Sequence, residues 1–411
     1  MNVWILQTGE PLHCDEESAR PMRAINLSNK LTDAGHNVVL WSSSFYHQKK
    51  RHRSRRYAVH KISRRLEIRL IHSLGYKKHI GIVRVIDHAH LAWNLRAALK
   101  KEKTIPDVAF VGYPPIEASA IMSNWLKNKG VPTILDVKDL WPSIFVDVFP
   151  RVLRPFARFL LYPYFVLAKK TMKEVDGIST MSQGFLDWCL NFSNRYPSEN
   201  DRVFRLTTLS MDLEFKKSCA ERLYWDKMGV TSDDANIIFV GTFSTAFDFE
   251  QVYIAAKLVK DCHFILCGHG PCLSRTKDMM RDLPNVIFPG WIDASQLKSL
   301  SGISIATLAP YKNVENFTLN IPNKIVDSLM FGLPILSPLK GEVKSLISDN
   351  KVGFTYDDKN TLASCIQTLV ADSKLHGEMS INAKNLYKDK FEFNKVYDGL
   401  VNHLESMAAG K

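Results

Sequence analysis

The first 42 residues, MNVWILQTGEPLHCDEESARPMRAINLSNKLTDAGHNVVLWS, decide the fold class. Residues 3–6 are a short apolar run typical of a buried strand, and a mostly polar loop follows at 7–17. From Pro21 to Ala34 apolar residues recur at helical spacing, Gly35 and His36 end this helix, and residues 37–42 form a second apolar run. A β-α-β unit of this kind predicts an α/β protein with parallel strands and helices on both faces of the sheet.

The same alternation of strands and helices recurs along the chain, which at 411 residues is too long for one ordinary core. The polar, poorly periodic stretch 195–215 is typical of a linker. We therefore expect two Rossmann-like domains, residues 1–205 and 206–411, the second with a terminal helix at 396–407. Ligands bind at the carboxyl ends of such sheets, so we expect the domains to face each other across a central cleft. Further strands are predicted at 108–112, 132–137, 177–182, 237–241, 263–267, 286–288 and 303–306.

The segment 320–336, NIPNKIVDSLMFGLPIL, carries the strongest functional signal. Pro322 suits the first turn of a helix, where its missing N–H costs nothing. The amides of Asn323 and Lys324 would then point at an anion, helped by the helix dipole and by the lysine charge. Asp327 lies one turn further on, where its carboxylate can accept hydrogen bonds from ribose hydroxyls. An ordinary helix with a Pro start and a Gly stop is the alternative interpretation.

This segment resembles the donor-site motif P-S-K-x-x-E-Y-x-x-x-G-x-P-V of the family 4 retaining glycosyltransferases, which have the GT-B fold. It looks closest to the branch that includes bacterial N-acetyl-L-fucosaminyl transferases. The resemblance implies a donor nucleotide held by Asp327 at its ribose and by Asn323 and Lys324 at its phosphates. Five other stretches resemble the family in the same order: GHNV (35–38), DVKDLWP (136–142), VGTF (240–243), LCGHGP (266–271) and FPGWI (288–292).

The resemblance also implies which other residues contact the donor, and it has departures. The family has Glu eight residues before its ribose-binding acid, where this chain has Leu319, and that acid is Asp327 rather than Glu. No Arg or Lys occurs between Thr242 and Phe249 to clamp the diphosphate, so the clamp is expected from Lys324 and backbone amides. The predicted donor-binding residues are Gly9, Thr242, Phe243, Gly268, His269, Trp291, Asn323, Lys324 and Asp327.

Catalytic groups are sought where polar residues follow strands of the first domain. Glu10 and His13 follow the first strand, and Asp139 follows a later one. A carboxylate or imidazole there can take the proton that the acceptor hydroxyl loses. A loop-capping or helix-capping role is the alternative for each. A zinc site at Cys262, His263, Cys267, His269 and Cys272 is not expected, because strand alternation spreads these residues and no second C-x-x-C follows. We predict no metal and no cofactor, the nucleotide-sugar being a substrate.

The formal net charge of +12 comes from one region, because residues 49–103 hold 17 Lys or Arg against 3 acidic residues. A solvated loop is the simplest interpretation of such a run. The functional alternative is contact with anionic phospholipid or with the pyrophosphate of a polyprenyl-linked saccharide acceptor. Residues 152–173 add apolar, aromatic and basic side chains as an interfacial helix would. The predicted acceptor and membrane residues are Lys49, Lys50, Arg51, Arg53, Arg55 and Arg56.

The sequence thus predicts a glycosyltransferase that moves a sugar from a nucleotide-sugar to a lipid-linked saccharide. By resemblance, the donor is UDP-linked, configuration is retained, and the product belongs to surface polysaccharide or O-antigen assembly. The 7 scattered cysteines, an N-terminus without a charged leader and the lack of a spanning helix favour a cytoplasmic, peripherally membrane-bound protein. A nucleotide-sugar epimerase of the same fold is the alternative. A basic nucleic-acid-binding protein is a weaker one, because no stacking sheet or recognition helix accompanies the basic run.

Overall fold

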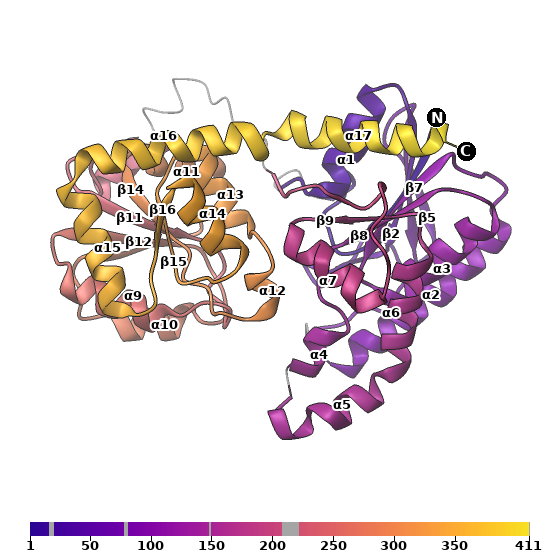
Figure 1. Ribbon diagram of the computed structural model, residues 1–411, viewed down its shortest axis with the longest axis horizontal. Helices are drawn as coiled ribbons and strands as arrows, with labels where there is room; N and C mark the ends of the chain where they lie inside the picture. The colour runs from indigo at the N-terminus through magenta and orange to yellow at the C-terminus, as the bar shows by residue number, and fades with distance from the viewer. Residues whose placement is uncertain (16–19, 78–80, 148, 208–221, 411) are drawn as a thin grey trace. The chain divides into compact units, whose positions relative to one another are not determined.

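The computed structural model describes residues 1–15, 20–77, 81–147, 149–207 and 222–410. These form two compact α/β units, each built on its own parallel or mostly parallel sheet (Figure 1). Unit 1 comprises Met1–Arg205 and Asn394–Lys411, and unit 2 comprises Leu206–Phe393. The expectation of two Rossmann-like sheets is confirmed.

Unit 1 is built on an eight-stranded sheet in the order β10-β9-β8-β7-β1-β2-β6-β5, in which only the edge strand β5 is antiparallel to its neighbour. The strands β1, β7, β8 and β9 are almost wholly buried, as expected for a sheet covered on both faces. The strand bounds are β1 Asn2–Leu6, β2 Asn37–Ser43, β5 Ala58–Lys61, β6 Leu66–Ile71, β7 Val108–Tyr113, β8 Thr133–Val137, β9 Gly177–Thr180 and β10 Arg202–Val203.

Helices pack on both faces of this sheet. The helices α2, α3, α6 and α7 lie side by side in that order. Their core is rich in tryptophan: Trp4 of β1 stacks on Trp125 of α3 with ring centroids 5.3 Å apart. The bounds are α1 Arg23–Asp33, α2 Ile82–Lys101, α3 Ile116–Asn128, α6 Tyr162–Glu174 and α7 Gln183–Ser193.

The C-terminal helix α17, Phe393–Ala409, returns to unit 1 from Asn394 onward, whereas the sequence-based division placed residues 206–411 in one domain. Ion pairs fix it against the first β-α-β unit: Lys30 with Asp398 at 2.8 Å, and the His36 ring with Glu405 at 2.7 Å. Apolar burial along the helix, with Leu400 and Leu404 fully buried, explains why this helix completes unit 1.

The region predicted as one interfacial helix, residues 152–173, is divided into three short elements. A 3₁₀ turn at Arg151–Leu153 is followed by α5, Arg154–Leu160, and then by α6. Pro155 and Pro163 lie in the first turns of α5 and α6, where proline starts a helix instead of continuing one. A shorter helix, α4, spans Ser143–Asp147. Among the described residues, no helix has the length and apolarity needed to cross a membrane.

Unit 2 is built on a six-stranded, wholly parallel sheet in the order β13-β12-β11-β14-β15-β16. This is the Rossmann order, in which the chain moves outward from β11 in one direction and then from β14 in the other. The strand bounds are β11 Ala235–Val240, β12 Cys262–Cys267, β13 Val286–Gly290, β14 Ser304–Leu308, β15 Ile335–Ser337 and β16 Gly353–Thr355. The helix bounds are α9 Phe249–Leu258, α10 Leu273–Met280, α11 Ala294–Gly302, α12 Glu315–Thr318, α13 Asn323–Phe331, α14 Glu342–Asn350, α15 Lys359–Ala371 and α16 Ser373–Lys390.

Candidate functional site

The switch point of the unit 2 sheet lies between β11 and β14, whose following chain segments diverge. In open α/β sheets ligands bind outside the carboxyl ends of the strands at such a point. Val240 ends β11 there, and Gly241 and Thr242 follow it. The turn at Gly268 and His269 lies beside them, because β12 pairs with β11 in parallel. Thr242 and His269 are exposed, and Trp291, which directly follows β13, is 64% exposed.

Glycines bring the loops at this edge into direct backbone contact. A Cβ on Gly268 would lie 1.9 Å from the carbonyl oxygen of Gly241, and one on Gly270 would lie 2.3 Å from that of Phe243. Backbone hydrogen bonds from Gly241 N to Cys267 O (3.0 Å) and from Phe243 N to His269 O (2.9 Å) join the two loops. The donor-binding residues predicted in these two loops are therefore held together by their backbones. The side chain of Phe243 is the exception.

Phe243 is fully buried rather than open to a ligand. Its ring stacks on Phe249 of α9 at 5.0 Å and 18° and meets Phe239 of β11 at 5.3 Å. Its side chain therefore packs the core beneath the loop, and only its backbone lies at the edge of the sheet. An aromatic residue three positions after a strand gives no sequence signal that separates a ligand contact from a core position.

The helix α13 begins beside this switch point, as the segment 320–336 predicted. Pro322 is its N-cap, and Gly332, with φ +72°, ends it in the left-handed conformation. Asn323 is exposed at the first turn. The amides of the first turn of a helix lack partners within the helix and favour an anion.

Lys324 points inward from α13 to the end of β11. Its ammonium group donates a hydrogen bond to the carbonyl oxygen of Val240 and lies 4.0 Å above the ring of Phe239. The residue as a whole is half-buried, and its ammonium group is enclosed. This burial lowers the pKa of Lys324 to about 7, with Asp327 and Cys267 acting in the opposite direction.

Asp327 lies one helical turn beyond Lys324 and is half-buried. Burial raises the pKa of Tyr311, which follows β14, and the Asp327 carboxylate adds to this effect. The Tyr311 ring packs against Phe247 at 4.5 Å and against Phe317 at 4.9 Å. The switch point thus combines a lysine and a carboxylate of α13 with aromatic rings from two connections, the one between β11 and α9 and the one between β14 and α13. Leu319, which takes the place of the family's Glu, is the C-cap of α12.

The corresponding edge of unit 1 contains a buried network of charges that the sequence reasoning missed. Asp136, at the end of β8, pairs with Arg23 of α1 at 2.7 Å and with Lys138 at 3.3 Å. Lys138 also pairs with Glu10, which follows β1. The sequence signal was present in the DVKD stretch, but the second carboxylate, Asp139, was chosen instead of the first.

Glu10 is almost fully buried, and its position agrees with the capping alternative. Its second carboxylate oxygen accepts a hydrogen bond from the backbone N–H of Ala24, in the first turn of α1, at 2.7 Å. Together with Lys138, this contact engages both oxygens of Glu10. The Glu10 carboxylate therefore stabilises the start of α1 and pairs with the charge of Lys138.

The remaining predicted residues of this edge are more open. His13 is half-buried, and its Nε2 lies 2.7 Å from the side-chain oxygen of Asn29. Asp139 is half-buried two residues after β8, and Gly9 is exposed in the loop after β1. The catalytic roles of Glu10, His13 and Asp139 stay predictions.

Part of the basic run lies in a short hairpin, and the rest of it is loop. Strands β3, Phe45–Tyr46, and β4, Arg51–His52, pair in an antiparallel manner. Arg53 is buried, and its guanidinium binds both carboxylate oxygens of Asp15, at 2.8 and 2.6 Å. This residue therefore anchors the β1–α1 loop and is not available to an acceptor or a membrane. Lys50 is half-buried over the Tyr76 ring, whereas the exposed members of the predicted set are Lys49, Arg51, Arg55 and Arg56.

The Cys and His residues weighed as a zinc site lie around β12. Cys262 and Cys267 are buried, and burial raises their pKa values to about 11 and about 12. Across the ranges that the structure describes, no three or more His, Cys, Asp or Glu side chains are grouped for a metal ion.

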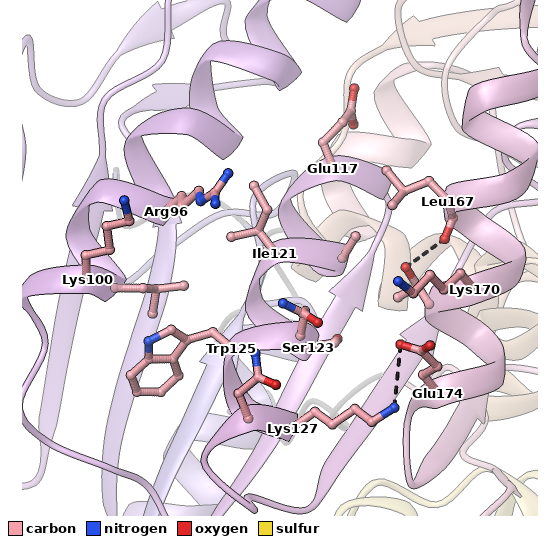
Figure 2. A pocket seen from close by; sticks show the side chains of 15 residues that line it. Arg96, Lys100, Glu117, Ile121, Ser123, Trp125, Lys127, Leu167, Lys170 and Glu174 are labelled. Atoms are coloured by element: carbon pink, nitrogen blue, oxygen red, sulfur yellow. Dashed lines mark hydrogen bonds and ion pairs between the residues drawn. The ribbon is translucent and has the colours of Figure 1, made fainter.

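A cavity of about 460 Å³ lies on unit 1 between α2, α3 and α6 (Figure 2). Glu117 stands at one end of it, and the ion pair of Lys127 with Glu174, at 3.6 Å, stands at the other. Burial raises the pKa of Glu117. None of the residues predicted for donor, acceptor or catalysis lines this cavity.

The chain resembles known proteins in both sequence and structure. Residues 225–386 match the family described as glycosyl transferases group 1. No curated protein matches the chain in sequence. Among solved structures, a sucrose-phosphate synthase from Thermosynechococcus elongatus superposes with a TM-score of 0.73 at 12% identity, over 100% of each chain.

Two further structures share the fold. A glycosyltransferase from Rickettsia africae has a TM-score of 0.67 at 13% identity, over 100% of this chain and 99% of that chain. The Anabaena protein HepE, in complex with UDP-glucose, has a TM-score of 0.66 at 12% identity, over 99% of this chain and 100% of that chain. The N-acetyl-L-fucosaminyl branch finds no support in these comparisons. Residues 225–386 therefore resemble the group 1 glycosyltransferases, and the chain has the GT-B fold.

Proposed function

We propose that this protein transfers a sugar from a UDP-sugar to a lipid-linked saccharide at a membrane surface, with retention of configuration, in surface polysaccharide or O-antigen assembly. The observation that carries the proposal is the arrangement at the unit 2 switch point. There Lys324 and the first turn of α13 meet the end of β11, and Asp327 lies one turn along the same helix.

The donor side follows from charge and spacing. A nucleoside diphosphate needs cationic and N–H groups at its phosphates and an acceptor of hydrogen bonds at its ribose. Lys324 and the α13 amides supply the first, and Asp327 supplies the second. The exposed Trp291 offers a flat surface for a nucleobase. UDP is the proposed nucleotide because the HepE structures of the same fold hold UDP and UDP-glucose.

The membrane side follows from exposed apolar residues on the 3₁₀ turn at Arg151–Leu153, on α5 and on the first half of α6. Phe159 is 76% exposed and Val152 is 88% exposed, although both are strongly apolar. Basic residues alternate with them, as in a helix that lies at a lipid interface. This surface, called the α5 surface below, consists of Val152, Leu153, Phe156, Phe159, Leu160, Tyr162 and Val166, with Arg151, Arg154, Arg158 and Lys169 among them.

Calorimetry with UDP and GDP tests the donor site. Asp327→Ala is expected to weaken UDP binding about 10- to 100-fold, since a hydrogen bond to a charged group contributes about 1.5–3 kcal/mol. Asp327→Glu should keep most of the affinity, and Asp349→Ala, an exposed aspartate on α14, is the matched control. A folded wild-type protein that binds neither nucleotide would contradict the proposal.

Two further measurements test the transfer and the membrane. Incubation of a UDP-sugar with the protein alone separates an epimerase, which changes the sugar, from a transferase, which needs a lipid-linked acceptor to consume the donor. In vesicle sedimentation, Phe159→Ser should reduce binding about tenfold or more, because burying such a side chain contributes about 1.5–3 kcal/mol. Val370→Ser, an exposed apolar position on α15, is the control. Equal loss in both variants would refute the α5 surface.

A further inference from the structure

A second cavity of unit 1, about 580 Å³, lies between the segment before β5, the end of β6 and one face of α2. Arg55 and Arg56 come from the first of these elements and His72 from the second. His90, Asn94 and Lys101 come from α2, at the spacing that places residues on one face of a helix. Neither the donor site nor the α5 surface shares any of these residues.

The charge of this cavity is strongly positive. Arg55, Arg56 and Lys101 line it. Among the described residues that line this cavity, Glu102 is the one with a carboxylate. Glu102 is already engaged by Arg69 and by the backbone N–H groups of the two residues that follow it, at 3.0 and 2.8 Å. The cationic groups therefore face a cavity without a carboxylate to neutralise them, which favours an anionic ligand.

The polar groups of the cavity are held in place before any ligand binds. Ser54 fixes the turn that presents the arginines, since its hydroxyl accepts a hydrogen bond from Arg56 N at 3.2 Å and donates one to Arg56 O at 2.9 Å. Asn94 donates a hydrogen bond to the carbonyl oxygen of His72 at 3.0 Å. The Nδ1 atom of His72 is buried and has no hydrogen-bond partner within the described part of the chain.

The histidines add a group that can respond to an anion. The His72 ring lies between His52 of β4, at 6.2 Å, and His90 of α2, at 5.3 Å. Burial lowers the pKa of His72, as do His90 and His52, while Asp87 of α2 acts in the opposite direction. An anion in the cavity would raise this pKa, so the ligand and a proton would bind together.

The elements that line the cavity also carry exposed apolar residues, which form its apolar rim in the proposal below. On α2, Trp93 is 72% exposed and Ile86 is 52% exposed, and both lie within one turn of His90. On the other side, Tyr57, which lines the cavity directly before β5, and Val59 of β5 are exposed. A soluble anion has no use for such a rim, whereas an amphiphile would bury its apolar part there. We propose that this cavity binds the phosphoryl head group of an anionic amphiphile, with its apolar part on the Trp93 rim.

The test is sedimentation with vesicles of phosphatidylcholine containing a rising fraction of phosphatidylglycerol, whose phosphodiester does not titrate between pH 5 and 8. Arg55→Gln/Arg56→Gln is expected to lower the partition coefficient about 30-fold, at about 1 kcal/mol per basic residue. The matched control is Arg64→Gln/Arg65→Gln, an exposed pair of equal charge in the β5–β6 turn, which should cost less than about fivefold because diffuse charge is screened. Equal losses in the two double variants would overturn the proposal.

Two further arms identify the occupant. Trp93→Ser should weaken binding to these vesicles, and lowering the pH from 7.5 to 5.5 should strengthen it in wild type but not in His72→Gln/His90→Gln. Calorimetry with inorganic pyrophosphate should show weak binding. Tight pyrophosphate binding that needs Arg55 and Arg56, with no effect of Trp93→Ser on vesicles, would overturn the amphiphile. UDP affinity, measured on the same variants, should not change, so failure here is distinguishable from failure of the donor site.

Discussion

The buried ammonium group of Lys324 makes a quantitative prediction about how a nucleotide binds. Burial against β11 lowers its pKa to about 7, so about half of the molecules carry the proton at neutral pH. A phosphate about 4 Å away would favour the charged form by about 4 kcal/mol at an effective dielectric constant near 20, or about 3 pKa units. The pKa in the complex would therefore be near 10. Binding and protonation are then linked, and UDP should bind more tightly when Lys324 is protonated.

The magnitude follows from these two pKa values. Between pH 7.5 and pH 9 the free protein loses the Lys324 proton while the complex keeps it, so UDP affinity should fall about 20-fold. This window avoids the terminal phosphate of UDP, which titrates near pH 6. Calorimetry in two buffers of different ionisation enthalpy should show proton uptake that approaches one per UDP at pH 8.

The variant Lys324→Met separates this linkage from other causes. It should bind UDP more weakly at pH 7.5, and its affinity should hardly change up to pH 9. Lys312→Met, which removes an exposed lysine after β14, should keep the wild-type pH dependence. An affinity in the wild type that is flat between pH 7.5 and 9 would refute the reasoning, and so would an unchanged slope in Lys324→Met.

Lys324→Met, which should weaken UDP binding, should stabilise the unliganded protein. The folded-state pKa of Lys324 lies below its unfolded value, so folding disfavours the cation. This penalty is fully present below about pH 7 and disappears as the pH rises toward the unfolded-state value of 10.5. Lys324→Met should therefore raise the Tm of the free protein at pH 7, and the gain should shrink at pH 9. A lower Tm at pH 7 would show that the Val240 contact outweighs the desolvation.

Three other substitutions test the structure. Arg53→Ala should destabilise unit 1 by about 3–5 kcal/mol in urea unfolding, because it leaves Asp15 buried without its cation, and the double variant Arg53→Ala/Asp15→Ala should recover part of this loss. Glu117→Gln should raise the Tm at pH 8 and leave it unchanged near pH 4. Burial raises the folded-state pKa of Glu117, so the wild type loses stability as the pH rises from the unfolded-state pKa to the folded-state pKa. A series of Tm measurements at increasing pH checks this difference. Gly268→Ala should abolish UDP binding in a shift assay, since its Cβ would meet a backbone carbonyl at 1.9 Å, whereas Gly302→Ala, with open space around it on α11, should leave binding intact.

The strands that could be predicted are those buried on both faces. Runs such as residues 3–6 and 237–241 are wholly apolar or nearly so, and a parallel sheet covered by helices requires this pattern. Strand β6, with the sequence LEIRLI, was missed because Glu67 and Arg69 interrupt it. The structure accommodates Arg69 by placing it over the Trp41 ring at 4.8 Å and pairing it with Glu67 at 2.6 Å. The Trp41 ring belongs to β2, so the sequence around Arg69 gives no sign of this partner.

The helix α2 was missed for a related reason. Its apolar residues are not confined to one face, because Val83, Ile86 and Trp93 are exposed while Leu91 and Leu95 are buried. A helix that is apolar on a solvent-exposed face lacks the 3.6-residue periodicity on which the prediction depends. The departure from the pattern coincides with the rim that we assign to an amphiphile, so it has a functional explanation.

For the site, sequence order predicted the position of Lys324 and Asp327, but not the direction in which each side chain points. Helix α13 could be located from Pro322 and Gly332, because these residues act within their own turn. The contacts of Glu10 and Arg53 depend instead on side chains that come from distant parts of the chain. Whether a charged residue is exposed or buried in a pair is therefore decided by tertiary structure.

Gly241 connects the sequence motif to the charge on Lys324. A Cβ at this position would lie 2.7 Å from the Lys324 ammonium nitrogen, and its φ of +156° lies in the region that favours glycine. The glycine that follows β11 thus leaves the space into which the lysine folds. With this space, the ammonium contacts a carbonyl and an aromatic ring when no nucleotide is present. A diphosphate at α13 would be a stronger partner than either, because its charge restores the protonated state that burial disfavours. The VG pair and the PNK segment, which lie 84 residues apart at Val240 and Lys324, therefore act as one unit in the proposed donor site.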